Sequence, residues 1–341
     1  MTEHTPSWPE LPVGDWIDTL ETLHRYVQIV GKVRMTQSPW LNHSWSVPLY
    51  VTSSGLGTSL VPHGNEGFEI RFDFIRHELV LSTTTGEQRT LSLLGGGSER
   101  GDGALVGGAS ERGGKAGPLS VAAFYREVMA MLDSVGMPVR IHATPSEIPN
   151  ATPFPKDEEH EYYDGDQVHT LWRALVQSER VFSRFRSGFR GKASPVHFFW
   201  GSFDLAVTRF SGRPAPPHPG GIPNFPDEVA REAYSHEVTS CGFWPGNREA
   251  PDPIFYAYAY PTPEAFAKSK VEPKDAFWLE QLGEFALPYE SVRTADDPDA
   301  LVMSFIESCH RAAADLAKWD RDELECAHPD GPDWWRIKVQ S

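Results

Sequence analysis

Hydrophobic positions in the first third of the chain follow a helical spacing and then a strand spacing. Apolar residues recur every three or four positions over residues 15–34, which is typical of one face of an α-helix. Phe68, Ile70, Phe72 and Phe74 then alternate with polar residues, which indicates a half-buried antiparallel strand. The same patterns predict further strands at 45–51, 57–61, 78–82 and 89–93 and a second helix at 119–136.

The second half of the chain repeats this order. Helical spacing returns over residues 166–188, and a last helix is predicted over residues 298–318, where Asp297 caps the helix and Pro298 occupies its first turn. Between these helices, the pattern predicts strands at 196–200, 203–210, 237–243, 254–260 and 284–289. Both halves therefore consist of a helix, an antiparallel meander and a second helix.

Short matches accompany this common order. Gly31-Lys32, followed by Ser38-Pro39, His43 and Trp45, corresponds to Gly191-Lys192, followed by Ser194-Pro195, His197 and Trp200. Each group lies where the first helix of its half leads into the first strand. We therefore predict an α+β fold that is an internally duplicated pseudo-dimer, in which each half is a helix–antiparallel β-meander–helix unit.

Composition along the chain sets the expected boundaries. The first repeat covers residues 1–144, a linker rich in proline and acidic residues covers 145–165, the second repeat with the candidate site covers 166–320, and a C-terminal tail covers 321–341. Residues 95–117 are rich in glycine and contain Ser-Glu-Arg-Gly twice, which predicts a flexible, dispensable insertion. This segment lacks the spacing of a phosphate-binding loop.

Charge and composition narrow the function classes. The 341 residues include 31 Lys and Arg against 47 Asp and Glu, a net charge of −16 that disfavours nucleic-acid binding. No apolar run is long enough to span a membrane, and the N-terminus lacks the pattern of a secretory signal. Three cysteines cannot form a disulfide framework. We expect a cytoplasmic protein with a small-molecule ligand, no nucleic-acid or membrane partner, and homo-oligomer formation as an open question.

The residue types that carry chemistry are concentrated between positions 190 and 246. His197, Asp204 and His236 form a candidate two-histidine, one-carboxylate set for one divalent metal ion, with Glu237 as a spare ligand or base. His197 and Asp204 would point to opposite faces of a straight strand, so this set needs a turn at Gly201-Ser202. The alternative is that the histidines have structural roles.

Cys241 is a candidate nucleophile in the same region. A nearby imidazole can activate a thiolate, and His236 is five residues away. Five residues along a strand also place two side chains on opposite faces, so the partner would be His197 from another strand. The alternative is a small buried cysteine. The candidate catalytic residues are therefore His197, His236, Glu237 and Cys241.

Basic and aromatic residues suggest a ligand site here as well. The region from Arg180 to Arg213 is the one basic stretch of this acidic chain, and it predicts either a solvated helix face or an anion clamp. Alternating tyrosines at 256–260 either pack in the core or line a pocket. The candidate ligand-binding residues are Lys192, Trp200, Arg209 and Trp244. The Pro-rich run 213–221 is predicted to stay out of the sheet, as a loop over the same face.

Several motifs resemble those of one bacterial family. They are Trp8-Pro9-Glu10-Leu11-Pro12, Leu23-His24 with Gln28-Ile29-Val30-Gly31-Lys32, the run from Ser194 to Ala206, Arg209 to Arg213, and Ser235 to Gly246. The chain is similar in these stretches to the bacterial domain of unknown function 5996 family. The resemblance covers nearly the whole chain and implies no catalytic residue, because this family has no assigned activity.

Two functions remain open on the sequence. The first is a metal-dependent enzyme acting on a small anionic metabolite at a site between residues 190 and 246. The second is a non-catalytic protein that binds a small molecule or oligomerises through the same aromatic pocket. Convergence of His197, His236 and a carboxylate would favour the enzyme, since metal–ligand bonds are about 2 Å long.

Overall fold

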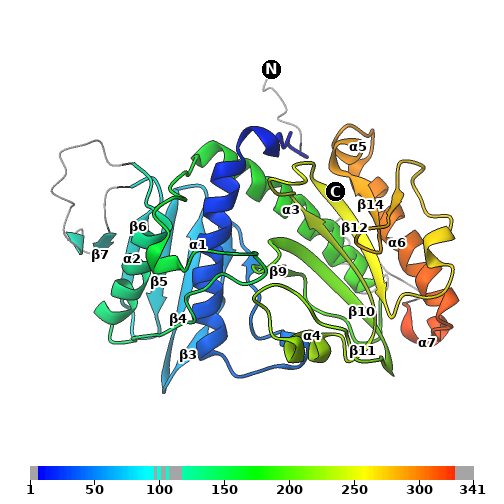
Figure 1. Ribbon diagram of the computed structural model, residues 1–341, viewed down its shortest axis with the longest axis horizontal. Coiled ribbons are helices and arrows are strands. Elements are labelled where there is room, and N and C mark those ends of the chain that lie inside the picture. The colour runs from blue at the N-terminus through cyan, green and yellow to red at the C-terminus, as the bar shows by residue number, and fades with distance from the viewer. Residues whose placement is uncertain (1–6, 96–97, 101–104, 107–116, 327–341) are drawn as a thin grey trace, which may run out of the picture.

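The structure is a computed structural model that describes residues 7–95, 98–100, 105–106 and 117–326. Its described residues form two antiparallel sheets, each covered by helices on one face, and the two sheets lie next to each other (Figure 1). This arrangement confirms the predicted α+β class. Within the described residues, every helix is too short or too polar to cross a membrane.

In the chain, the strands of the first sheet come after the long helix α1 (Ile17–Gln37). Its strand order is β1-β2-β4-β5-β6-β7-β8, and β3 pairs with β4. The helix α2 (Val121–Ser134) lies beside α1 on one face of this sheet (Figure 1). The strands are β1 (Tyr50–Val51), β2 (Gly55–Gly57), β3 (Val61–His63), β4 (Glu66–Asp73), β5 (Glu78–Thr83), β6 (Gln88–Ser92), β7 (Ser98–Arg100) and β8 (Leu105–Val106).

The second sheet has the order β13-β14-β12-β11-β10-β9. Its strands are β9 (His197–Phe199), β10 (Asp204–Pro214), β11 (His236–Trp244), β12 (Ile254–Tyr260), β13 (Phe277–Leu279) and β14 (Glu284–Pro288). The long helices α3 (Gly165–Ser187) and α6 (Pro298–Leu316) pack on one face. The shorter helices are α4 (Asp227–Ala233), α5 (Tyr289–Arg293) and α7 (Arg321–Leu324).

Apolar alternation and helix capping explain most of these elements. Phe72 of β4 stacks on Phe124 of α2, which in turn stacks on Tyr26 of α1 with ring centroids 3.9 Å apart. Asp164 and Asp297 cap α3 and α6, because each carboxylate accepts a hydrogen bond from a backbone N–H in the first turn. Most buried hydrophobic residues of both halves form one cluster, and Phe189, Ala314 and Trp319 form a second, small one.

The two sheets meet at their edges. The N–H of Leu49, just before β1, donates to the carbonyl of Phe198 in β9 at 2.9 Å, and the N–H of Phe198 donates back to Leu49 at 2.8 Å. This antiparallel bridge joins the edge of one sheet to the edge of the other. We refer to it as the Leu49–Phe198 bridge.

The predicted strands 45–51 and 57–61 are shorter in the structure, as β1, β2 and β3, and two segments expected to be loops contribute to the sheets. The Pro-rich run does not stay out of the sheet at its start, because β10 continues to Pro214, which pairs with His236. Pro214 is the last residue of β10 and lies beyond the part that pairs with β9, where the missing N–H donor of a proline is tolerated. Within the glycine-rich segment, β7 and β8 extend the first sheet. Its remaining residues 96–97, 101–104 and 107–116 lie outside the described residues.

Candidate functional site

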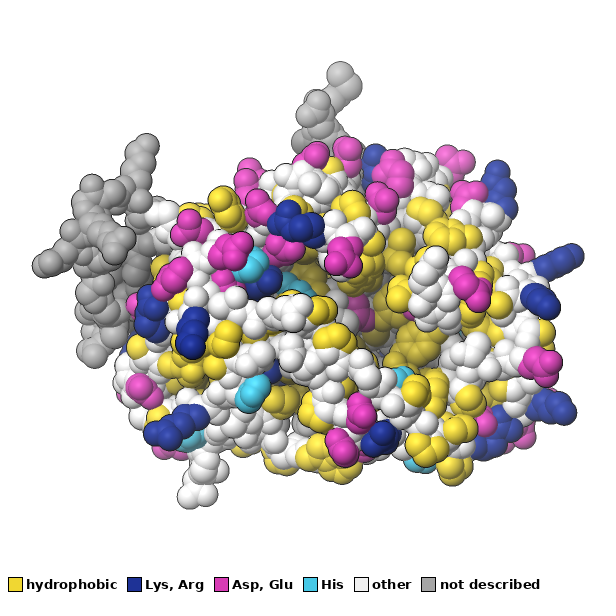
Figure 2. Space-filling view, viewed as in Figure 1, with side chains coloured by type: hydrophobic (Ala, Val, Ile, Leu, Met, Phe, Trp, Pro, Cys, Tyr) yellow, Lys and Arg dark blue, Asp and Glu magenta, His cyan; other side chains and the backbone are white. Residues whose placement is uncertain are grey.

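A cavity of about 840 Å³ lies over the second sheet, on the face opposite α3 and α6. The helix α4, the loop before it and the last turns of α1 form its walls, and Figure 2 shows the hollow with hydrophobic side chains inside it. Aromatic residues dominate the walls, among them Trp45, Phe199, Trp200, Phe210, Phe225 and Trp244. Such a volume suits a small organic molecule.

Strand alternation creates both the floor and the space above it. Successive residues of a strand point to opposite faces, so Asp204, Ala206 and Thr208 of β10 face the cavity together. On the neighbouring strand β11, Ser240 faces the same way. These side chains are small, and Gly242 has none, so the centre of this sheet face leaves space for the cavity above it. A Cβ at Gly242 would overlap the hydroxyl of Tyr256, which lies over this position.

Asp204 is a carboxyl group in the floor of the cavity. Its side chain is buried, and the hydroxyls of Ser202 and Tyr256 both donate hydrogen bonds to its carboxylate. Burial raises the pKa of Asp204, whereas these two donors favour the ionised form and oppose that rise. The turn at 200–203 places Asp204 at the start of β10, and Phe203 takes the left-handed conformation there, with φ of 63°.

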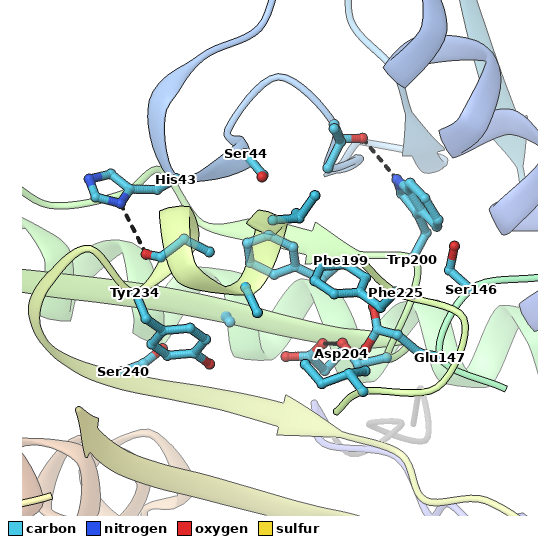
Figure 3. Close-up of a pocket in the computed structure, with 18 of the residues that line it drawn as sticks. His43, Ser44, Ser146, Glu147, Phe199, Trp200, Asp204, Phe225, Tyr234 and Ser240 are labelled. Atoms are coloured by element: carbon cyan, nitrogen blue, oxygen red, sulfur yellow. Dashed lines mark hydrogen bonds between the residues drawn. The ribbon is translucent and has the colours of Figure 1, made fainter. Parts of the chain in front are cut away.

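Glu147 reaches the same cavity from the segment between the two halves. Its backbone φ is 62°, in the left-handed region, and its N–H donates to the carbonyl of Pro223 at 2.9 Å. The Glu147 carboxyl rests on Gly201, where any Cβ would overlap Oε1. Figure 3 shows the side chain of Glu147 pointing towards Asp204. Burial, reinforced by the charge of Asp204, raises the pKa of Glu147 to about 7.

A third carboxyl group comes from β14. Glu284 lines the cavity, and burial together with the nearby charge of Asp204 raises its pKa to about 7. Tyr234 and Tyr258 lie nearby in the lining, with their hydroxyls hydrogen-bonded at 2.9 Å. We call Glu147, Asp204 and Glu284 the carboxyl cluster. Near neutral pH, Glu147 and Glu284 are each close to half protonated.

A row of polar side chains on α1 supports this cluster. His24, Gln28 and Lys32 follow the i, i+4, i+8 spacing of one helix face. Gln28 accepts from the Ser146 N–H at 2.7 Å and donates to the Ser146 carbonyl at 2.9 Å, which fixes the residue next to Glu147. His24 contacts the Gly201 carbonyl at 2.9 Å, and Lys32 donates to Ser146 Oγ at 2.9 Å.

Burial lowers the pKa of both titratable groups in this row. It lowers the pKa of His24 to about 4, so this imidazole is neutral at physiological pH. It also lowers the pKa of Lys32 to about 8. The Lys32 ammonium lies 5.6 Å from the centroid of the Trp200 ring. The sequence motif Leu23-His24 with Gln28 to Lys32 contains this row. The apolar periodicity predicts only that α1 packs on the core, so it does not identify these polar residues as part of a site.

The structure does not bring His197 and His236 together. The His197 ring is fully buried, 5.5 Å from Tyr50 and 6.2 Å from Trp45, and burial lowers its pKa to about 3. The His236 ring instead lies 5.7 Å from His43. The described residues include no group of three His, Cys, Asp or Glu side chains placed to hold a metal ion. The proposed metal set therefore does not assemble.

Two other predicted residues lie on the opposite face of the sheet. Arg209 is fully buried against α3, with its guanidinium 3.4 Å from the centroid of the Phe185 ring, and it pairs with Glu307 of α6 at 3.2 Å. Cys241 shares this face, and burial raises the pKa of its thiol. Asp204 and Arg209 are five positions apart in one strand, so only Asp204 faces the cavity.

The remaining predicted residues are divided between the cavity and its surroundings. Trp200 and Trp244 line it. Lys192 lies 2.6 Å from His43 Nε2 and 5.2 Å from the centroid of the Trp45 ring, next to two residues of the lining. Glu237 pairs with Arg213 at 2.6 Å and is not among the residues that line this cavity.

Comparison with known proteins identifies the family and no activity. No curated protein and no solved structure matches the chain. A family described as being of unknown function, DUF5996, matches residues 8–98 and 109–326. The residues left between these two ranges lie within the glycine-rich segment. With most of its length matched, the chain belongs to the DUF5996 family of unknown function.

Proposed function

We propose that the protein binds a small organic cation with an apolar body in the cavity over the second sheet. The observation that carries this proposal is the carboxyl cluster. Among the described residues, no Lys, Arg or His lies within ion-pair distance of Glu147, Asp204 or Glu284, and the charge of Lys32 offsets only part of the rise in the pKa of Glu147. Carboxylates in an apolar cavity need a compensating charge, and a cationic ligand would supply it.

The aromatic walls support the same ligand class. Faces of tryptophan and tyrosine attract cations, and Trp45, Trp200 and Trp244 all line the cavity. Trp200 and Trp45 already have the lysine ammonium groups of Lys32 and Lys192 near their rings. The remaining apolar lining would bury the body of the ligand.

This proposal takes small-molecule binding from the second function expected from the sequence and replaces the anionic ligand of the first with a cation. An anionic metabolite would need cationic side chains in the cavity, but Arg209 lies behind the sheet. Lys32, the one lysine or arginine among the described residues of the lining, already donates to Ser146 and interacts with the charge of Glu147. A metal-dependent reaction has less support, because the predicted ligands do not meet.

Three aromatic probes of similar size test the charge preference: benzylammonium, benzyl alcohol and benzoate. Titration calorimetry, or quenching of cavity tryptophan fluorescence, gives each dissociation constant. We expect the cation to bind at least tenfold more tightly than the alcohol, a difference of about 1.4 kcal/mol, and benzoate to bind most weakly. Equal affinities for the three probes would refute the proposal.

Variants then assign the preference to the carboxyl cluster. Asp204→Asn keeps the shape of the side chain and should remove most of the cation preference, and Glu284→Gln should reduce it. The matched control is Glu228→Gln, because Glu228 is an exposed carboxylate on the helix that covers the cavity. If Glu228→Gln weakens binding as much as the cluster variants do, the effect comes from overall charge.

Affinity for benzyltrimethylammonium should also rise between pH 6 and pH 8. This ligand has a fixed charge, so only the protein titrates. Glu147 and Glu284, with pKa values near 7, lose their protons in that window and attract the cation more strongly. A gain of about tenfold is expected if both groups contribute. Dissociation constants at four pH values check this, and a flat profile contradicts it.

We also propose that the two halves arose by internal duplication. Both sheets are antiparallel, follow a helix in the chain and keep sequence order except at β3 and β13, and their edge strands meet at the Leu49–Phe198 bridge. The contacts are reciprocal: Lys32 of the first half lies over Trp200, and Lys192 of the second lies over Trp45. Overlay of residues 15–136 on 166–318 tests this, since Lys32 must fall on Lys192.

A further inference from the structure

We infer that Glu147 is a general acid–base residue, and that the cavity therefore transfers a proton to or from the molecule that it binds. This inference extends the proposed function from binding to chemistry in the same cavity. It rests on how Glu147 is held, on what surrounds its carboxyl group, and on the neighbouring carboxylate of Asp204.

The backbone of Glu147 is fixed by contacts from distant parts of the chain. A glutamate rarely adopts a positive φ, and the value of 62° persists here because the preceding residue and the N–H of Glu147 are both anchored. Gln28 binds both backbone groups of Ser146, and the carbonyl of Pro223 accepts the Glu147 N–H. Lys32 holds the Ser146 hydroxyl. A surface glutamate would need none of these anchors.

The side chain of Glu147 is also held in a defined position. Its carboxyl group lies on the bare backbone of Gly201, whose carbonyl is held by His24. Both Gly201 and Glu147 line the cavity, so a bound molecule would meet the carboxyl group directly. Figure 3 shows Glu147 and Asp204 on the same side of the cavity, with Phe225 and Phe199 close by. These apolar neighbours limit the access of water.

The two carboxyl groups have different environments, which suits them to different roles. Asp204 accepts hydrogen bonds from the hydroxyls of Ser202 and Tyr256, which favour its ionised form against the burial that raises its pKa. Glu147 has no described hydrogen-bond donor to its side chain, and its pKa of about 7 lets it accept or give up a proton near neutral pH. Glu147 would carry the proton, while Asp204 would hold a positive charge on the ligand.

A proton-abstraction probe tests this without knowledge of the natural substrate. In 5-nitrobenzisoxazole, a base removes the proton on C3, the C3–H electron pair forms the nitrile, and the N–O bond breaks to give 2-cyano-4-nitrophenolate. The proton passes to Glu147 and then to water, so no other reactant is needed. The phenolate absorbs visible light, which makes the rate directly measurable.

We expect the protein to catalyse this elimination, with a rate that rises through pH 7 as Glu147 loses its proton. Glu147→Gln should lower kcat/KM at least a hundredfold, a typical loss for a general base. The exposed control Glu228→Gln should leave the rate unchanged. The positioning variant Gln28→Leu should lower kcat more than it raises KM, because it loosens the Ser146 anchor and leaves the cavity walls in place.

Two outcomes would overturn the inference: a Glu147→Gln variant as active as the original protein, or a pH profile of the original protein that levels off near pH 4.5. The second measurement needs no variant, so it holds even if Glu147→Gln fails to fold. If benzylammonium binds but the elimination does not depend on Glu147, the inference fails and the proposed binding function stands. If the elimination depends on Glu147 but the cation does not bind preferentially, the proposed cation binding fails and the inference about Glu147 stands.

Discussion

Replacing Gly31 with alanine should destabilise the protein by about 2–3 kcal/mol, as a group added to a filled core does. In an exposed helix, the same change would stabilise by roughly 0.5–1 kcal/mol. Here, a Cβ would overlap three atoms of the Trp200 indole. The ring cannot move freely, because its Nε1–H donates to the Val47 carbonyl at 2.9 Å. Urea denaturation measures the loss.

A matched control and a second substitution isolate this contact. Gly117→Ala adds the same methyl group where the structure has open space, so its stability should change little. Combining Gly31→Ala with Trp200→Leu should cost clearly less than the sum of the two single changes, since a leucine leaves room for the methyl group. Strict additivity of the two changes would mean that Gly31 and Trp200 do not compete for space.

Replacing Glu147 and Glu284 with glutamine should stabilise the protein at pH 8, by on the order of 2 kcal/mol for each residue. Both carboxyls have a folded pKa near 7, above the ordinary value of 4.5. Between these values, the folded state binds more protons than the unfolded state, so stability falls as the pH rises. Glutamine does not titrate and avoids that loss.

The expected gain therefore depends on pH. It should be small at pH 4, where all these carboxyls are protonated, and it should reach its full size above pH 7. Denaturation curves at pH 4, 6 and 8 check the trend, with Glu228→Gln as the surface control. A gain of equal size at every pH would show that the glutamine variants act through packing and not through charge.

Periodic patterns in the sequence predicted the main elements, because their apolar faces pack on extended surfaces. The helix at 15–34 corresponds to α1, and the alternating phenylalanines lie in β4. The helix α4 was missed, since its 7 residues are too short for a clear period. Pro226 directly precedes the helix, and Asp227 and Glu228 occupy its first turn. This combination is typical of a helix N-terminus and is the signal in the sequence that predicts α4.

The candidate site was predicted only in part. Asp204, Trp200 and Trp244 do line the cavity, but Glu147 lies in the stretch that composition assigned to a linker. A single residue in a proline-rich stretch has no period, and contacts with α1 more than 100 residues away in sequence place it here. Strand alternation already predicts that Arg209 and Asp204, five positions apart in one strand, point to opposite faces of the sheet.

The Leu49–Phe198 bridge also bears on how this chain avoids self-association. An uncovered strand edge presents free N–H and C=O groups that can recruit a strand from another molecule and seed aggregates. At the bridge, each sheet covers the other's edge inside one chain. If the chain were cut between the halves and the halves separated, both edges would be uncovered. Each half alone would then expose a strand edge that can pair with other molecules.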